Sequence, residues 1–328
     1  TAIQRVEFGT NYEEFDTAMS RQGFIGHEIF RPLFRRNQTG DVPQRGIQDV
    51  MPNSSRTNRR AVGAGYRRVS GRWTKHTFAT EEYGVEELID DRETMMYEDM
   101  FDQEMWAAER STDQVLREYE INAATLANNT SVYTTTQAAT AAFSVKATAT
   151  PVADILTLVK TIEDACGLSP NFVAMDRALY REAKETNEVI DRLKYWGGDD
   201  PKNTTPAALA ELFDVERVII AGKLQSREPG VVIKNTANEG AASATLARIW
   251  SQTQVVVGVM ANRPDPATTC LGRTVMWSKE NRALGGGRPV TINEQYRDEK
   301  VRGDVSRSRM DSQLLPLTTA CAGILTGC

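Results

Sequence analysis

The chain has 328 residues, 40% of them hydrophobic and 25% charged, a composition that excludes disordered, collagen-like and low-complexity proteins. Its length predicts about two domains with a sizeable buried core. The formal net charge of −5 argues against a surface that grips nucleic acid as a whole. No stretch approaches the ~20 apolar residues of a membrane-spanning helix, and the first residues lack a secretory signal, so we expect a cytosolic chain without a membrane partner.

Residues with catalytic or metal-binding chemistry are sparse. His27 and His76 have no partner at metal-ligand spacing and are expected to be surface or interface side chains. The sequence contains no P-loop, complete dinucleotide fingerprint or nucleophile elbow. We therefore expect no catalytic residue, no metal and no cofactor. The four cysteines have no CxxC spacing and are expected to be reduced, mostly buried thiols: Cys166, Cys270, Cys321 and Cys328.

Charge is sorted sharply along the chain. Residues 31–75 carry eleven basic and two acidic side chains, whereas residues 81–120 carry fifteen acidic and three basic ones. Such neighbouring blocks of opposite charge indicate association, either within the chain or between subunits. A nucleic-acid patch at 56–68 is disfavoured because Tyr66 is the only aromatic residue there.

The two charged blocks predict different structures. Residues 31–80 are rich in loop-forming residues and poor in apolar ones, so we expect a long, poorly buried β-hairpin that a partner must order. No Gly or Pro occurs between Glu86 and Asn128, and apolar residues recur there at steps of three or four, which predicts one long helix. The group Met95, Met96, Met100 and Met105 is expected to pack in the core or in an interface.

From Pro151 onward the sequence alternates between helices and strands. Pro151 begins a helix that ends at Gly167, and Asp176 caps a helix after the buried strand 172–175. A helix beginning at Thr205 and Pro206 precedes another apolar strand. The remaining strands are expected at 215–221, 249–260 and 269–277 and in a polar tail over 290–317.

Several stretches resemble one known family when they are read in order. They are YGVEELIDDR at 83–92, Pro151 with Asp154 and Ile155, GLSPN at 167–171, VIDRLKY at 189–195, ALAELF at 208–213 and VIIAG at 218–222. Together they are similar to the major capsid protein of tailed bacteriophages, which has the Hong Kong 97 type fold. Residues 1–80 and 223–328 match this family only in character.

The resemblance implies an α+β fold with five parts: an N-terminal arm (1–30), an extended β-hairpin loop (31–80), a peripheral domain with a long spine helix (81–150), an α/β axial domain (151–275) and return strands (276–328). In such proteins the extended loop lies across the peripheral domain of a neighbouring subunit, where the two charged blocks would meet. The candidate intersubunit residues are therefore Arg45, Arg56, Arg59, Arg60, Arg67, Arg68 and Arg72 on the loop, and Glu86, Glu87, Asp90, Asp91, Glu93, Glu98 and Asp102 on the acidic side.

The function that the resemblance implies is structural. A homo-oligomeric, self-assembling major capsid protein would form hexamers and pentamers of an icosahedral shell around double-stranded DNA, which it would meet by non-specific proximity. Its location would be the capsid of a bacteriophage virion assembled in the host cytoplasm, and its partners would be itself and portal, scaffolding and decoration proteins. An encapsulin-type nanocompartment shell is the main alternative, and an enzyme built on residues 151–260 is a third.

Overall fold

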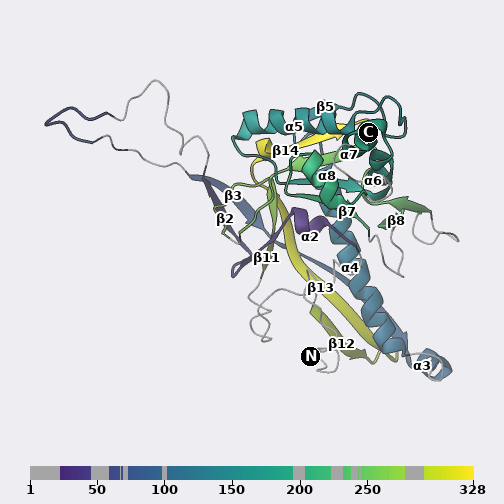
Figure 1. Cartoon of the computed structure of the whole chain (residues 1–328). Helices are drawn as coiled ribbons and strands as arrows, with labels where there is room; N and C mark the ends of the chain where they lie inside the picture. The colour runs from purple at the N-terminus through teal and green to yellow at the C-terminus, as the bar shows by residue number, and fades with distance from the viewer. Residues whose placement is uncertain are drawn as a thin grey trace.

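The computed structural model describes residues 23–45, 59–66, 68, 73–97, 102–194, 204–222, 232–237, 243, 245–263, 265–277 and 292–328. Within these ranges two five-stranded sheets are connected by a long helix, and a two-stranded hairpin leads away from them (Figure 1). This mixture of helices and sheets agrees with the predicted α+β class. None of the helices in the described part of the chain combines the length and apolar character that a membrane crossing requires.

The first sheet is organised around its longest strand, β13 (Gly303–Pro316). One edge of β13 pairs antiparallel with β4 (Glu81–Asp90). Two strands pair antiparallel with the other edge of β13: β12 (Ile292–Asp298) pairs with its first half, and β11 (Gly272–Trp277) pairs with its last residues. Finally, β1 (Pro32–Arg35) pairs parallel with β11. Segments far apart in the sequence therefore meet in one sheet.

Helix α4 (Gln103–Ala127) packs on β4 and β13 of this sheet. Three of the β13 side chains on this face are small and buried, Ser306, Ser308 and Ser312, while the larger Met310 packs in the core with Leu116 and Tyr119 of α4. Asp102 caps the helix by accepting a 3.1 Å hydrogen bond from the Met105 amide. The helix ends at Asn128, as predicted, and its buried stripe includes Leu116, Tyr119 and Ala123.

The predicted beginning of the long helix was wrong. Glu86–Asp90, expected to be helical, belong to strand β4, and a separate helix, α3 (Asp91–Tyr97), follows directly. The strand forms because its backbone pairs with β13 along its whole length, and this pairing overrides the local helical pattern. Because the partner strand lies more than two hundred residues later in the chain, the local sequence could not reveal it.

The second sheet has the order β5 (Thr135–Ala138), β14 (Ala322–Thr326), β10 (Gln254–Gly258), β6 (Phe172–Asp176) and β7 (Arg217–Ala221). Its three inner strands, β14, β10 and β6, are largely apolar because both of their faces are buried, whereas the edge strand β5 is polar and partly exposed. Alternate residues of β6 face two different clusters: Val173 and Met175 pack with α5, whereas Phe172 and Ala174 pack with α4. The sheet thus separates two hydrophobic cores.

Three helices around the second sheet begin where the sequence predicts, and α5 also ends there. Helix α5 (Pro151–Cys166) ends at Gly167, whose φ of 70° is a left-handed conformation that glycine adopts without steric cost. The Asp176 side chain caps α6 (Arg177–Lys184), and Thr205 caps α8 (Pro206–Leu212). The remaining short elements are α7 (Asn187–Lys194), β8 (Ile233–Asn235), β9 (Leu246–Arg248) and the 3-10 helix η4 (Thr319–Cys321).

The hairpin consists of β2 (Thr39–Arg45) and β3 (Trp73–Ala79), which pair antiparallel as predicted. Its base is not poorly buried, however. Val42 and Phe78 pack in a small cluster with Leu315 and other residues of the first sheet, and the Ala79 amide donates a 2.9 Å hydrogen bond to the Gln313 side chain. The hairpin is therefore anchored on its own chain at its base.

The cysteines and His27 are buried side chains. All four cysteines are free and buried, as predicted. His27, which was expected at a surface or an interface, is instead only 5% exposed within this chain. Burial, with a smaller contribution from the Arg31 charge, lowers its pKa to about 4. His27 is therefore a neutral side chain of the core near neutral pH.

Candidate intersubunit surface

The tip of the hairpin, residues 59–66, is the most exposed part of the described chain. The chain's own core covers almost none of the apolar surface of this segment, because the Val62 and Tyr66 side chains are 106% and 79% exposed. Arg59 and Arg60 are exposed beside them, and the Arg60 guanidinium lies 4.7 Å from the centre of the Tyr66 ring. Figure 1 shows this segment far from both sheets. We define residues 59–66 as the hairpin tip.

Of the other basic candidates, the structure describes only Arg45 and Arg68. Arg68 is exposed close to the hairpin tip in sequence. Arg45 is the last residue of β2, opposite Trp73 in the register of the hairpin. Arg56, Arg67 and Arg72 lie outside the described residues. The structure thus places Arg59, Arg60 and Arg68 on an exposed arm.

Three of the acidic candidates already have basic partners within the chain. Glu86 forms an ion pair with Arg307, Glu87 lies 3.3 Å from Arg110, and Asp91 accepts two hydrogen bonds from Arg297 at 2.5 and 2.6 Å. The hydrogen bond and charge of Arg297 hold the pKa of Asp91 below its usual value. These carboxylates are therefore partly neutralised before any partner arrives.

The basic partners form a network on one face of the first sheet, which sequence analysis missed. Arg307 of β13 lies between Glu86 of β4 and Glu294 of β12, and the Tyr296 ring lies 5.0 Å from its guanidinium. Arg309 adds a 2.8 Å hydrogen bond to Glu294. Arg307 and Arg309 alternate along a polar strand, a pattern that could have placed them on one face. Their acidic partners on β4 follow only from the register.

The remaining acidic candidates lie near α3. Glu93 is exposed on that helix, whereas Asp90 accepts a 2.7 Å hydrogen bond from the Arg92 amide and Asp102 caps α4. Glu98 lies outside the described residues. Together β4, α3 and the first turns of α4 therefore present carboxylates, only some of which are paired within the chain.

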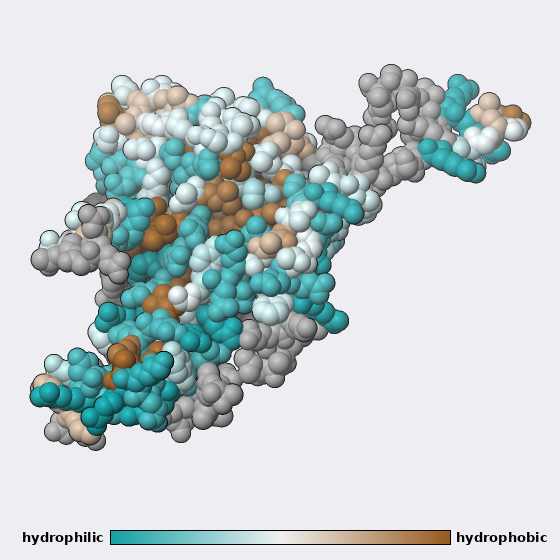
Figure 2. All heavy atoms as spheres, turned by 180° about the vertical axis from the view of Figure 1, so that it is seen from behind, coloured by the Kyte–Doolittle hydropathy of each residue, from teal (hydrophilic) through white to brown (hydrophobic). Residues whose placement is uncertain are grey.

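Large apolar side chains are exposed in the same region. Met95 and Met96 of α3 are 76% and 64% exposed, and Met105 and Trp106 of α4 are exposed as well. Core packing, one of the two predictions for the methionines, is thus wrong for Met95, Met96 and Met105, while interface packing stays a prediction; Met100 lies outside the described residues. Figure 2 shows hydrophobic residues among hydrophilic ones toward the end that carries α3. We define β4, α3 and the first turns of α4 as the acidic end.

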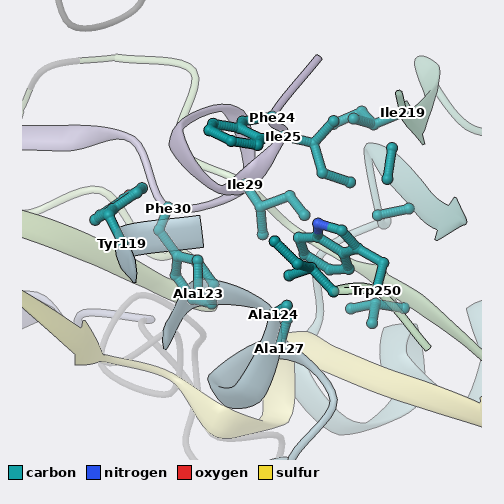
Figure 3. Close-up of a cluster of buried hydrophobic side chains, with 14 of the residues drawn as sticks. Phe24, Ile25, Ile29, Phe30, Tyr119, Ala123, Ala124, Ala127, Ile219 and Trp250 are labelled. Atoms are coloured by element: carbon teal, nitrogen blue, oxygen red, sulfur yellow. The ribbon is translucent and has the colours of Figure 1, made fainter. Parts of the chain in front are cut away.

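A buried carboxylate, Glu120, fixes the positions of the elements between the two sheets. It accepts hydrogen bonds from the amides of Ile25 (2.9 Å) and Gly26 (2.8 Å), next to α2 (Gly26–Ile29), and from the Trp250 indole (2.6 Å). Figure 3 shows the surrounding hydrophobic side chains, among them Ile25 and Trp250. Burial raises the pKa of Glu120 to about 7, against the opposing effect of its three donors. Glu120 is one of the fifteen acidic residues of the block 81–120, but its side chain is buried in the core.

Gly26 is required for this arrangement, which we call the Glu120 joint. A Cβ atom at position 26 would lie 2.6 Å from the Glu120 carboxylate and 2.7 Å from the Ala123 side chain. Since neither neighbour has space to retreat in this core, only glycine lets α2 approach α4 so closely. The joint ties α2, α4 and the segment before β10 into one body.

No metal site is evident in the described part of the chain. Its His, Cys, Asp and Glu side chains do not gather in any group of three or more that could hold a metal ion.

A sheet carried on a long helix, a second α/β unit and a projecting hairpin define the Hong Kong 97 type capsid fold, and this chain has that fold. No protein-family model and no curated protein sequence matches it. Solved structures match it over nearly its whole length.

One of these structures is a phage-related protein from Bordetella bronchiseptica, with a TM-score of 0.64 and 16% identity over 95% of each chain. A second is the capsid structure of the cyanophage P-SCSP1u, with a TM-score of 0.55 and 14% identity over 91% of this chain and 86% of that one. A third is a virus-like particle from Pyrococcus furiosus, with a TM-score of 0.52 and 8% identity over 96% and 99%. At such identities the likeness is one of fold.

Proposed function

We propose that this chain is a major capsid protein that self-assembles into hexamers and pentamers of an icosahedral shell enclosing double-stranded DNA. The observation that carries the proposal is the hairpin tip, which projects from a capsid fold and exposes arginines beside apolar side chains. A segment of this kind has no core of its own chain to pack on. Its natural partner is a surface of opposite charge on another copy.

The acidic end of a neighbouring copy supplies such a surface. It offers Glu93 and exposed methionine side chains, while Arg59 and Arg60 with Val62 and Tyr66 stand on the hairpin tip. Because the tip and the acidic end are different patches, each copy engages the next head to tail, and such contacts close into rings when the rotation allows. Hexamers and pentamers are rings of this kind.

The wider setting belongs to the same proposal. The shell would be part of a bacteriophage virion assembled in the host cytoplasm, with portal, scaffolding and decoration proteins as partners. Packaged DNA would meet the inner surface by non-specific proximity. The proposal assigns no catalytic step to residues 151–260.

A second function is favoured by one specific comparison. The Pyrococcus furiosus structure with this fold is described as a virus-like particle, and an encapsulin-type shell would use the same head-to-tail assembly around protein cargo. Particles purified from cells distinguish the two functions, because DNA-filled shells have a high absorbance ratio at 260 to 280 nm that nuclease cannot lower while the shell is closed.

The direct test is to purify the full chain and measure sedimentation together with electron micrographs. We expect closed shells of megadalton mass in equilibrium with small oligomers. A chain that sediments only as a monomer over a wide range of protein and salt concentrations would contradict the proposed assembly.

A further inference from the structure

Two of the four buried cysteines come together although they are far apart in sequence. Cys166 is the last residue of α5, and Cys321 is the last residue of η4, which packs against α5. Both side chains belong to the same hydrophobic cluster. The Cys166 thiol also donates a 3.3 Å hydrogen bond to the Leu168 carbonyl, which turns it back toward the end of its own helix.

The two thiols interact directly. A side-chain hydrogen bond between them lowers the pKa of Cys166 and raises that of Cys321, and burial adds to the rise at Cys321. Cys166 is therefore the thiol that more readily becomes a thiolate, which is the nucleophilic form. It is also the more accessible of the two, at 7% exposed against 0% for Cys321.

We propose that Cys166 and Cys321 form an intrachain disulfide when the folded protein meets a small oxidant such as hydrogen peroxide. The Cys166 thiolate attacks one peroxide oxygen, breaks the O–O bond and becomes a sulfenic acid, while the other oxygen leaves as water after protonation. The Cys321 sulfur then attacks the Cys166 sulfur and expels the sulfenic oxygen as a second water. Two thiols are oxidised by two electrons, and one peroxide is reduced to two waters.

The disulfide would stabilise the fold around the second sheet. It would join the end of α5 to the segment that leads into β14, and so close a loop of the chain from position 166 to position 321. Cross-links that close long loops stabilise proteins strongly when the native geometry accommodates them. This inference concerns the folded chain alone and does not depend on the proposed shell.

Cys270 is the competing partner. It is fully buried, its charge acts on Cys321, and burial raises the pKa of its thiol, with the nearby Arg273 guanidinium opposing that rise. Cys270 is thus a poorer first nucleophile than Cys166. Cys328, also buried with its pKa raised mainly by burial, belongs to the same hydrophobic cluster and serves as a second control.

The test exposes the full-length protein to hydrogen peroxide and then counts free thiols under denaturing conditions. The wild type should fall from four thiols to two and lose the mass of two hydrogens, and peptide mapping without reduction should find Cys166 joined to Cys321. The melting temperature should rise by about 5 °C on oxidation, and a thiol reductant should reverse both changes.

Single substitutions separate this bond from other oxidation. Cys166→Ser should keep its three thiols, and Cys321→Ala should lose only the Cys166 thiol, as a sulfenic acid that finds no second cysteine. Neither variant should form a disulfide or show a rise in melting temperature, whereas Cys270→Ser and Cys328→Ser should lose two thiols as the wild type does. Because Cys166 retains some exposure, Cys166→Ser remains informative even if Cys321→Ala folds poorly. Retention of four thiols by the wild type, a Cys270–Cys321 bond or a sulfinic acid as the end product would each overturn the proposal.

Discussion

The Glu120 joint and the hairpin tip both bring charged and apolar groups together, but the two regions are opposite in character. At the joint, Glu120 is buried and receives three hydrogen bonds from its own chain. At the tip, Arg59 and Arg60 are exposed beside Val62 and Tyr66. At the joint, the folded chain supplies the hydrogen-bond partners of the charged group. At the tip, the charged and apolar side chains remain exposed to water after folding.

Under the proposed function, folding and assembly would use separate residues in this chain. The acidic end stands between the two extremes, because Glu86 and Asp91 are paired with Arg307 and Arg297 while Glu93 stays exposed. Changes at the joint should therefore reduce stability, and changes at the tip should affect only association.

The largest effect is expected from reversing three charges at and beside the tip. The variant Arg59→Glu, Arg60→Glu and Arg68→Glu should stay soluble and folded but lose more than about tenfold in assembled shells, because many weak ion pairs recur at every copy. Sedimentation measures shells, and circular dichroism measures folding. The matched variant with three lysines keeps the charge and should assemble. Normal shells from the glutamate variant would show that the tip's charge has another purpose.

The joint should respond in the opposite way. Glu120→Ala leaves two amides and an indole N–H without their acceptor in the core, which should lower the free energy of unfolding by about 3 kcal/mol or more. Urea unfolding of the unassembled chain measures this loss. Glu118→Ala, an exposed carboxylate on the same helix, is the control and should be nearly neutral. An equal effect of both substitutions would contradict the joint.

The joint also predicts a pH dependence. Because burial raises the pKa of Glu120 from 4.5 to about 7 on folding, its stabilising contribution is complete below pH 4.5 and is lost as pH rises through 7. Glu120→Gln cannot titrate, so the difference in unfolding free energy between wild type and this variant should fall by roughly 3 kcal/mol between pH 4.5 and 8.5. A difference that does not change with pH would mean that Glu120 is ionised throughout.

A smaller effect is expected on the face of the first sheet. Arg307→Ala removes the cation between Glu86 and Glu294, but the Arg307 and Glu86 side chains are 36% and 48% exposed, so the loss of unfolding free energy should be about 1 kcal/mol or less. The loss should shrink at high salt because the ions screen exposed pairs. Thermal unfolding at two salt concentrations measures it, with Arg307→Lys as a variant that keeps the charge. A loss several times larger would show that this network stabilises the fold as strongly as the Glu120 joint does.

The smallest effect is expected from Arg59→Glu alone. One ion pair in a screened surface contributes ~0–1 kcal/mol, so the yield of shells and the melting temperature should both stay close to those of the wild type. If this single charge reversal abolishes assembly, Arg59 forms a specific ion pair with one partner residue. It would then do more than contribute one of several positive charges to the tip. This variant therefore sharpens the account of the tip.

Elements with local signals were predicted well from the sequence. The start of α5 at Pro151, its end at Gly167 and the caps at Asp176 and Thr205 are all fixed by residues within a few positions of the feature. The apolar run in β6 likewise reports a strand that is buried on both faces. Such features need no knowledge of the distant chain.

Features that depend on distant pairing could not be predicted. The strand at Glu86–Asp90 exists because of β13, and the partners of Glu86 and Asp91 come from the return strands. The role of Glu120 was hidden for the same reason, since its donors Ile25 and Trp250 lie 95 residues before it and 130 residues after it. Charge counts along a sequence cannot tell which acidic residues face inward.

The most direct test of the separation between folding and assembly is a cryo-electron microscopy reconstruction of the assembled shell. We predict that residues 59–66 of each copy lie on the β4–α3 region of a neighbouring copy, with Arg59 or Arg60 close to Glu93 and with Met95 or Met96 covered. The same map should show the Glu120 joint intact within every subunit. A hairpin tip that packs on its own chain, or that contacts no other subunit, would contradict the account.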